Sequence, residues 1–235
     1  VTQYDMKGVE ELGLLKMDFL GLRNLTVIDL TRDYVKANQG IDIDVDNLDL
    51  ADPKVYELLQ RGDSDGIFQL ESDGMRRLLA QLKPDRFEHI MALIALYRPG
   101  PMAEIPAYIE RKNDPSKIAY LHPALEDMTK ETYGVLVYQE QIVLLLQKLA
   151  GYTPGKADKV RKAIGKKIHA LMASLKGKFL DGCAANGVSP AVADQLWKDM
   201  ESSQDYSFNK AHSACYALIA YRTAWLKANH PCEYM

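Results

Sequence analysis

The chain has 235 residues, 47% of them hydrophobic and 26% charged, and its formal net charge is −3. This composition is ordinary for a globular protein of one or two domains, and no apolar run approaches the ~20 residues of a membrane span. The N-terminal stretch VTQYDMKGVEEL is polar and lacks the hydrophobic core of a signal peptide. The cysteines are scattered without a CxxC spacing, which predicts reduced core residues in a cytoplasmic protein. The chain begins with Val and stops in NHPCEYM without a cap signal, so we interpret it as a piece of a larger protein.

Residues 12–22, LGLLKMDFLGL, alternate in a way that predicts a short buried strand. Asp18 lies within it, and an ionised carboxylate in an apolar strand is costly unless it is paired or binds a metal. Two interpretations are open: an ion pair with Lys16 on the same face, and a ligand for Mg²⁺, which requires hard oxygen donors. From the residues alone the ion pair is favoured, because buried carboxylates are more often paired with protein groups.

Apolar periodicity and cap residues predict a series of helices along the rest of the chain. They cover residues 23–38, 53–59, 73–83, 85–97, 123–129, 135–151, 190–200 and 214–229. The acidic segment IDIDVDNLDLADP follows the first of them. It lacks the invariant glycine and the closing glutamate of an EF-hand loop, so we expect an edge strand or a linker with an exposed acidic face. GIFQLES at 66–72 is predicted as a short strand-like piece, and Gln139-Glu140-Gln141 interrupts the apolar run of helix 135–151.

Arg98 lies in the sequence YRPGP, where the preceding helix must end because the residue before a proline avoids the helical conformation. Arg98 is therefore expected at a rigid corner. The helix dipole alone explains a cation at a helix C-terminus. A rigidly placed Arg also suits a bidentate contact to phosphate, so both interpretations are open.

The stretch from Gly151 to Phe179 concentrates basic residues over an apolar series spaced three or four apart, which predicts a helix with one buried face. Its basic residues are Lys156, Lys159, Arg161, Lys162, Lys166, Lys167, Lys176 and Lys178. They form either a solvated face or a platform for phosphates. Gly165 favours the platform, because a helix break there would place backbone N–H groups beside two lysines.

A second candidate anion site precedes the last predicted helix. Ser213 is predicted as the N-cap of helix 214–229, which leaves Asn209, Lys210 and His212 just outside a helix N-terminus. The positive end of a helix dipole with a lysine and a histidine beside it is suited to an anion. A surface histidine often has no special role, and this alternative is open.

Several of these segments, taken in order, resemble one family. They are KMDFLGLRNLTVID, GIFQLES, ALYRPGPM, VYQEQI, LAGY, RKAIGKK and FNKAHSACYALIAYRTAWLKANHPCEYM. Together they resemble the alpha subunit of bacterial DNA polymerase III, a C-family replicative polymerase. The resemblance runs from about residue 4 to the end of the chain. The family has AMGKK where this chain has AIGKK, and Ser207 stands where related sequences often have Gly or Cys.

The resemblance implies a mainly α fold. Residues 1–30 are similar to the C-terminal piece of the palm, expected as a short strand and helix, and residues 31–235 to an all-helical fingers domain. Asp18 matches the third palm carboxylate, a catalytic ligand for Mg²⁺, which overturns the ion pair favoured above. The family's other two carboxylates form a DxD pair in an earlier palm segment, so the aspartates of IDIDVD are not that pair.

The implied activity is two-metal nucleotidyl transfer by a DNA-directed DNA polymerase. By similarity, the residues expected to bind the incoming dNTP are Arg98, Arg161, Lys166, Lys167, Asn209, Lys210 and His212. The implied partners are primer-template DNA, dNTP, the palm and thumb of the same polymerase, and replisome subunits, with no membrane. We expect the isolated chain to be inactive, because one carboxylate cannot hold two metal ions. The alternative is a helical nucleic-acid or protein interaction module without catalysis, which would have no use for Asp18.

Overall fold

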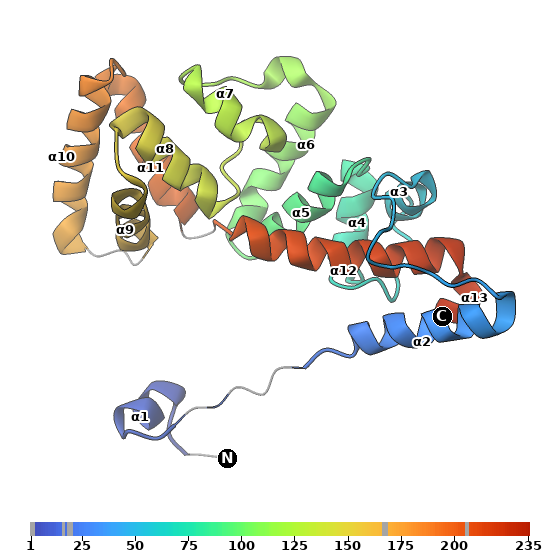
Figure 1. Ribbon diagram of the computed structural model, residues 1–235. Helices are drawn as coiled ribbons and strands as arrows, with labels where there is room; N and C mark the ends of the chain where they lie inside the picture. Colours follow the sequence, from blue (N-terminus) through green and yellow to red (C-terminus); the bar gives the residue numbers. More distant parts are fainter. Residues whose placement is uncertain (1–2, 16, 18–20, 166–168, 205–206) are drawn as a thin grey trace.

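The computed structural model describes residues 3–15, 17, 21–165, 169–204 and 207–235. Within these ranges the chain consists of helices and their connections, without a named strand (Figure 1). The α-helices are α1 Met6–Glu11, α2 Asn24–Gln39, α3 Pro53–Gln60, α4 Asp73–Leu82, α5 Phe87–Leu96, α6 Ile105–Asn113, α7 Ala124–Thr129, α8 Gln139–Ala150, α9 Pro154–Gly165, α10 His169–Ala185, α11 Pro190–Gln204, α12 Lys210–Asn229 and α13 Pro231–Tyr234. Short 3₁₀ helices lie at η1 Pro101–Glu104, η2 Pro115–Lys117 and η3 Lys130–Thr132. The prediction of a mainly α fold is confirmed.

The first hydrophobic core forms around α12, which packs against α5 and α3 (Figure 1). The small side chains of Ala217, Ala220 and Ala224 are completely buried and recur at helical spacing, so neighbouring helices approach α12 closely. Ser213 is also buried on this helix, and its hydroxyl donates to the carbonyl oxygen of Met91 at 2.6 Å. This core therefore fixes the orientation of α12 relative to α5.

A second core lies between α7, α8, α9, α10 and α11 and shares no described residue with the first. Trp197 and Phe179 are fully buried there, with ring centroids 5.5 Å apart. Two backbone hydrogen bonds tie Phe208 of the first core to the segment that leads into α8: Phe208 N donates to Val137 O at 3.0 Å, and Gln139 N donates to Phe208 O at 2.9 Å. The start of α8 is thus held directly beside the start of α12.

A third, smaller cluster packs α2 against the end of α12. Ile28 and Val35 of α2 are buried with Leu226 of α12. The acidic segment contributes the buried Ile43 and Val45, while Asp42, Asp44, Asp46 and Asp49 are exposed. Of the two alternatives predicted for this segment, the linker with an exposed acidic face is confirmed.

Buried Gln141 explains why α8 begins where it does. Its Oε1 accepts from the backbone N–H groups of Val137 and Tyr138 at 2.8 and 2.9 Å. Its Nε2 donates to Met128 O at 3.2 Å and to Thr132 Oγ1 at 2.8 Å. All four hydrogen-bonding positions of the amide are used, which makes this polar side chain stable in the interior.

Two strand predictions are wrong for the described residues. In the segment 12–22 the described residues are not in a strand, and Leu15 and Met17 are 84% and 66% exposed. A strand requires a neighbour to satisfy its backbone, and no described segment pairs with this one. Residues 66–72 form turns in which Gln69 adopts a left-handed conformation with φ 64°. The predicted boundary at residue 30 falls inside α2 and stays a prediction.

His89 of α5 is a buried titratable group with polar and charged neighbours at both ring nitrogens. Arg86 Nε lies 3.2 Å from His89 Nε2, and the Tyr133 hydroxyl lies 2.7 Å from the same nitrogen. His89 Nδ1 lies 3.3 Å from the backbone N of Asp85, which donates to it, and 3.1 Å from Asp85 Oδ1. Burial lowers the pKa of His89 to about 4, assisted by Arg86 and Lys112 and opposed by Asp85.

We expect acidification from pH 7 to pH 5 to lower the free energy of unfolding by about 2 kcal/mol through His89. Its pKa rises from about 4 in the folded chain to 6.5 in the unfolded chain. The unfolded state therefore binds the proton first, and this stabilisation is lost as the pH falls from about 6.5 to about 4. Urea unfolding at both pH values measures the loss. A His89→Gln variant should lack this part of the pH dependence, and an unchanged slope would contradict the assignment.

Candidate functional site

Residues predicted to bind an anion come together where α8, α9 and α12 meet. A pocket of about 370 Å³ opens at this junction. It is lined by Gln139, Glu140, Val143, Leu144, Asp158, Arg161 and Asn209. Arg161 and Asn209, which are distant in sequence, therefore line one pocket.

The N-terminus of α12 lies four residues earlier than predicted. Asn209, not Ser213, is the N-cap, and its side chain accepts from the backbone N–H of His212 at 2.8 Å. Ser213 lies inside the helix. Its hydroxyl donates to the carbonyl oxygen of Met91 in α5 and therefore does not cap α12. Lys210 and His212 consequently lie in the first turn of α12 rather than outside it.

Carboxylates of the same chain already occupy the donors at this helix N-terminus. Glu140 of α8 accepts from Lys210 N at 3.1 and 3.0 Å through its two oxygens, and from Asn209 Nδ2 at 2.8 Å. The ammonium group of Lys210 donates to both oxygens of Glu131, at 2.6 and 2.8 Å. The negative charge at this position is supplied by glutamates of the chain, and the predicted anion site stays a prediction.

Within the described residues the basic stretch is helical in α9, up to Gly165, and in α10, from His169, and residues 166–168 lie outside them. Arg161 donates to Asp158 Oδ1 through Nε at 3.1 Å and Nη2 at 2.9 Å. Lys162 Nζ lies 2.7 Å from the other oxygen of Asp158. Hydrogen bonds from Lys162 and Arg161 hold the pKa of Asp158 below its usual value. Arg161 is therefore held by a side chain of its own helix at the wall of the pocket.

Arg98 approaches the same region from the end of α5. Its guanidinium carbon lies 4.4 Å from the ring centroid of Phe208, and its Nε donates to Ala95 O at 3.1 Å. Phe208 continues into a ladder of rings, since His212 lies 5.2 Å from Phe208 and 4.2 Å from Tyr216 between centroids. Arg98 is half-buried, and burial lowers its pKa. The helix ends before Arg98 as predicted, and Arg98 is stacked on the residue that precedes the α12 cap.

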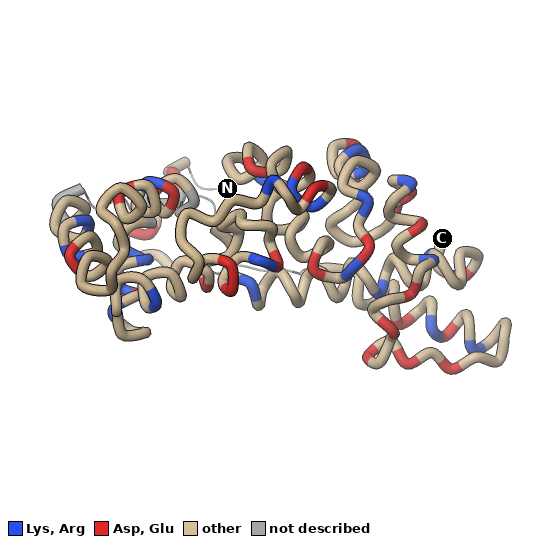
Figure 2. Tube along the Cα trace, turned by 90° about the horizontal axis from the view of Figure 1, so that it is seen from above, with Lys and Arg blue, Asp and Glu red and all other residues tan. Residues whose placement is uncertain are grey.

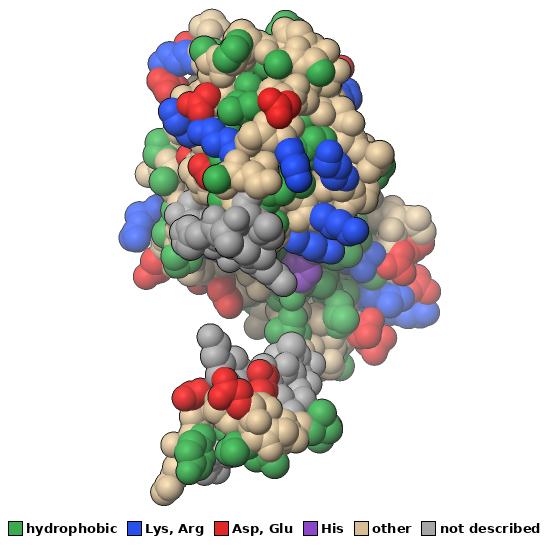
Figure 3. Space-filling view, turned by 90° about the vertical axis from the view of Figure 1, so that its left-hand side faces the viewer, with side chains coloured by type: hydrophobic (Ala, Val, Ile, Leu, Met, Phe, Trp, Pro, Cys, Tyr) green, Lys and Arg blue, Asp and Glu red, His purple; other side chains and the backbone are tan. Residues whose placement is uncertain are grey.

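Basic and acidic residues are interspersed over the surface (Figure 2). The end of the molecule that carries α9 and α10 shows groups of Lys and Arg side chains with acidic side chains among them (Figure 3). Lys176 Nζ, for example, lies 2.6 Å from Asp194 Oδ1, and Lys156 Nζ lies 4.0 Å from the Tyr152 ring centroid. The predicted basic face is therefore partly neutralised by its own carboxylates.

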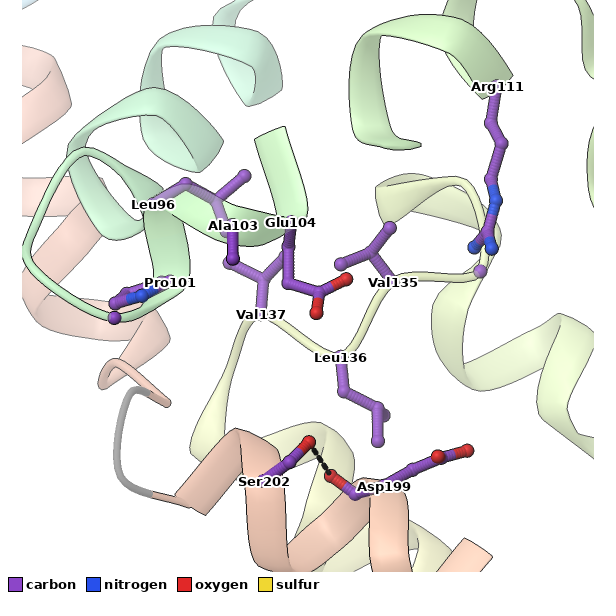
Figure 4. Close-up of a pocket in the computed structure, with 12 residues that line it drawn as sticks. Leu96, Pro101, Ala103, Glu104, Arg111, Val135, Leu136, Val137, Asp199 and Ser202 are labelled. Atoms are coloured by element: carbon purple, nitrogen blue, oxygen red, sulfur yellow. Dashed lines mark hydrogen bonds between the residues drawn. The ribbon is translucent and has the colours of Figure 1, made fainter. Parts of the chain in front are cut away.

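A larger pocket, of about 440 Å³, lies between η1, the segment 134–137 and the end of α11 (Figure 4). Its polar side chains include Glu104, Arg111 and Asp199. None of the residues predicted for anion binding lines it. The junction of α8, α9 and α12 is therefore the better candidate site.

Comparison with known protein families assigns the chain. Residues 24–187 match the bacterial DNA polymerase III alpha subunit finger domain. The chain belongs to this family. The DNA polymerase III subunit alpha of Aquifex aeolicus (strain VF5) is 52% identical over 99% of the chain, and that of Staphylococcus aureus (strain COL) is 47% identical over 98%. The chain spans only 20% and 22% of the lengths of these two relatives.

Of the residues that the resemblance assigns to this fingers family, Asp18, Lys166 and Lys167 lie outside the described residues. Arg161, Asn209 and Lys210 meet at the junction of α8, α9 and α12, with Arg98 and His212 on either side of Phe208. Sequence reasoning missed Glu131 and Glu140 as their partners. The polar interruption at the start of helix 135–151 was the available signal for Glu140.

Two absences concern only the part of the chain that the structure describes. There, no group of three or more His, Cys, Asp or Glu side chains is arranged to hold a metal ion. No helix in the same part is both long and apolar enough to cross a membrane.

Proposed function

We propose that this chain is the fingers segment of a replicative DNA-directed DNA polymerase, joined to the last piece of the palm. In this role it binds the triphosphate of the incoming dNTP beside the primer-template while the palm carries out nucleotidyl transfer. The supporting observation is that Arg161 and Asn209 line one pocket with Glu140, which also accepts from the backbone N–H of Lys210, in a chain of the polymerase finger family. The pocket combines a cation, an amide and a helix N-terminus, which together suit a phosphate group.

The described residues would act by binding and orientation. The first turn of α12 offers the backbone N–H of Lys210 and the side-chain amide of Asn209, both now used by Glu140. Arg161 presents a planar guanidinium from the facing helix α9. Such fixed donors stabilise charge on a transferring phosphoryl group without reorganisation.

Mg²⁺ would be held by Asp18 together with palm carboxylates that this sequence does not contain. It would supply activation of the primer hydroxyl and neutralisation of the phosphates. Because Asp18 lies outside the described residues, the fit of this site to the ion rests on the sequence alone. The fingers residues would be needed for the substrate to reach that ion in the correct orientation.

We expect Arg161→Ala or Lys210→Ala, in a full-length subunit containing this chain, to raise the KM for dNTP about tenfold or more. The estimate follows from the loss of a charge-assisted hydrogen bond to phosphate. Steady-state primer extension gives KM, and fluorescence anisotropy gives the affinity for primer-template, which should change little.

Lys162→Ala is the matched control for Arg161→Ala, because Lys162 also pairs with Asp158 but does not line the pocket. It should leave the KM for dNTP near the wild-type value. Equal effects of the three substitutions, or none, would contradict the assigned pocket. A full-length subunit that binds DNA but never extends a primer would favour the non-catalytic interaction module instead.

A further inference from the structure

Glu140 makes the contacts that a phosphate would make at the N-terminus of α12. Both of its oxygens face the backbone N–H of Lys210, at 3.1 and 3.0 Å, and one also accepts from Asn209 Nδ2 at 2.8 Å. A carboxylate and a phosphate present similar acceptor oxygens to such donors. Both cannot occupy this position at once.

The junction between α8 and α12 does not depend on Glu140. Backbone hydrogen bonds link Gln139 with Phe208 at 2.9 Å and Phe208 with Val137 at 3.0 Å. The amide of Gln139 adds a bond to Ser207 O at 3.2 Å. Glu140 is only half-buried and lines an open pocket, so its carboxylate can leave without exposing a core.

The cations beside Glu140 are neutralised in the same way. Glu131 accepts two hydrogen bonds from Lys210 Nζ, and Asp158 accepts two from Arg161. An arriving anion must therefore exchange with carboxylates of the chain rather than with water. A single negative charge gains little by this exchange, whereas a polyphosphate can replace several carboxylates at once.

We propose that Glu140 is an internal competitor of the substrate: it occupies the phosphate position at the N-terminus of α12 and swings out when a nucleoside triphosphate binds. This proposal rests on the proposed function. Glu140 acts as a positioning residue that sets the affinity for nucleotide and keeps the α12 donors ordered in the empty site.

The test is nucleotide binding by a full-length subunit with Glu140→Gln. The probe is the next complementary dNTP on a primer-template whose primer is chain-terminated, with inorganic tripolyphosphate as a probe that has no base. Glu140→Gln should tighten the binding of both about five- to tenfold, because a neutral amide competes less well for the α12 donors. Glu126→Gln, an exposed site on α7 that does not line the pocket, removes the same charge and should leave binding unchanged.

Glu140→Asp gives a second, independent measurement. It keeps the charge but shortens the side chain, so the carboxylate cannot reach both donors, and binding should tighten to an intermediate degree. Unchanged or weaker binding by both variants, at unchanged melting temperature, would overturn the proposal. If Arg161→Ala weakens binding while Glu140→Gln does not tighten it, only this proposal fails. If no variant binds triphosphate at this pocket, the proposed function fails with it.

Discussion

Replacing Asp18 by Asn in a full-length subunit should reduce primer extension by about a thousandfold or more, with little change in affinity for primer-template. A metal ion contributes several kcal/mol of charge stabilisation to the transition state, and about 4 kcal/mol corresponds to this factor. Asn keeps the shape of Asp but has no charge with which to hold Mg²⁺. The neighbouring Leu15 and Met17 are exposed, so the substitution should not disturb a described core.

Asp42→Asn is the control for this experiment. Asp42 belongs to the acidic segment after α2, where it is exposed and lies 2.8 Å from Lys36 Nζ. It should support normal synthesis, because these aspartates are not the metal pair of the family. Near-normal synthesis by Asp18→Asn would mean that Asp18 is only an ion-pair partner of Lys16. The catalytic assignment would then be wrong, even for a member of this family.

Gly182→Ala should lower the free energy of unfolding by at least about 3 kcal/mol. Gly182 lies in α10 at its contact with α8, and an added Cβ would overlap the backbone carbonyl group of Ala150. A backbone group at the end of a packed helix cannot rotate away, so the two helices must separate. That separation would open the second core near Cys183 and Leu149, both of which are buried. Chemical denaturation of the purified chain measures the loss.

Gly177→Ala is a matched control in the same helix. A Cβ at Gly177 meets nothing within 4 Å, so Ala should stabilise α10 by up to about 1 kcal/mol through helix propensity. The two substitutions add the same methyl group with opposite expected signs. Equal changes in stability would show that the close approach of α10 to α8 is not a constraint.

Helix positions were predictable where the signal is local. Ser72, Asp52 and Gly151 are residue types that favour helix ends, and they cap α4, α3 and α8 because their side chains or conformations act within a few residues. The prediction of Ser213 as the N-cap of α12 was wrong because its hydroxyl bonds to Met91, 122 positions away. Sequence alone cannot reveal such a partner. The described residues of 12–22 do not form the predicted strand for a related reason, since strands depend on neighbours that a local pattern does not specify.

The candidate site was predictable only in part. The family resemblance supplied Arg161, Asn209 and Lys210, and the fold brings them together. Their anionic partners were not predictable, because Glu140 and Glu131 reach Lys210 across 70 and 79 positions of the chain. Charge patterns show where cations are concentrated, but not which distant carboxylates neutralise them.

The second core has a consequence for folding. The helices from α8 to α11 form one continuous stretch whose ends are held together by the contact between Tyr138 and Phe208. Contacts within such a stretch are near in sequence and form quickly. The contacts of α12 with α5 and α3 form more slowly, because the whole stretch separates these helices in sequence. The stretch is therefore a nested foldon: it can assemble first, bring its two ends together, and shorten the loop that α12 must close.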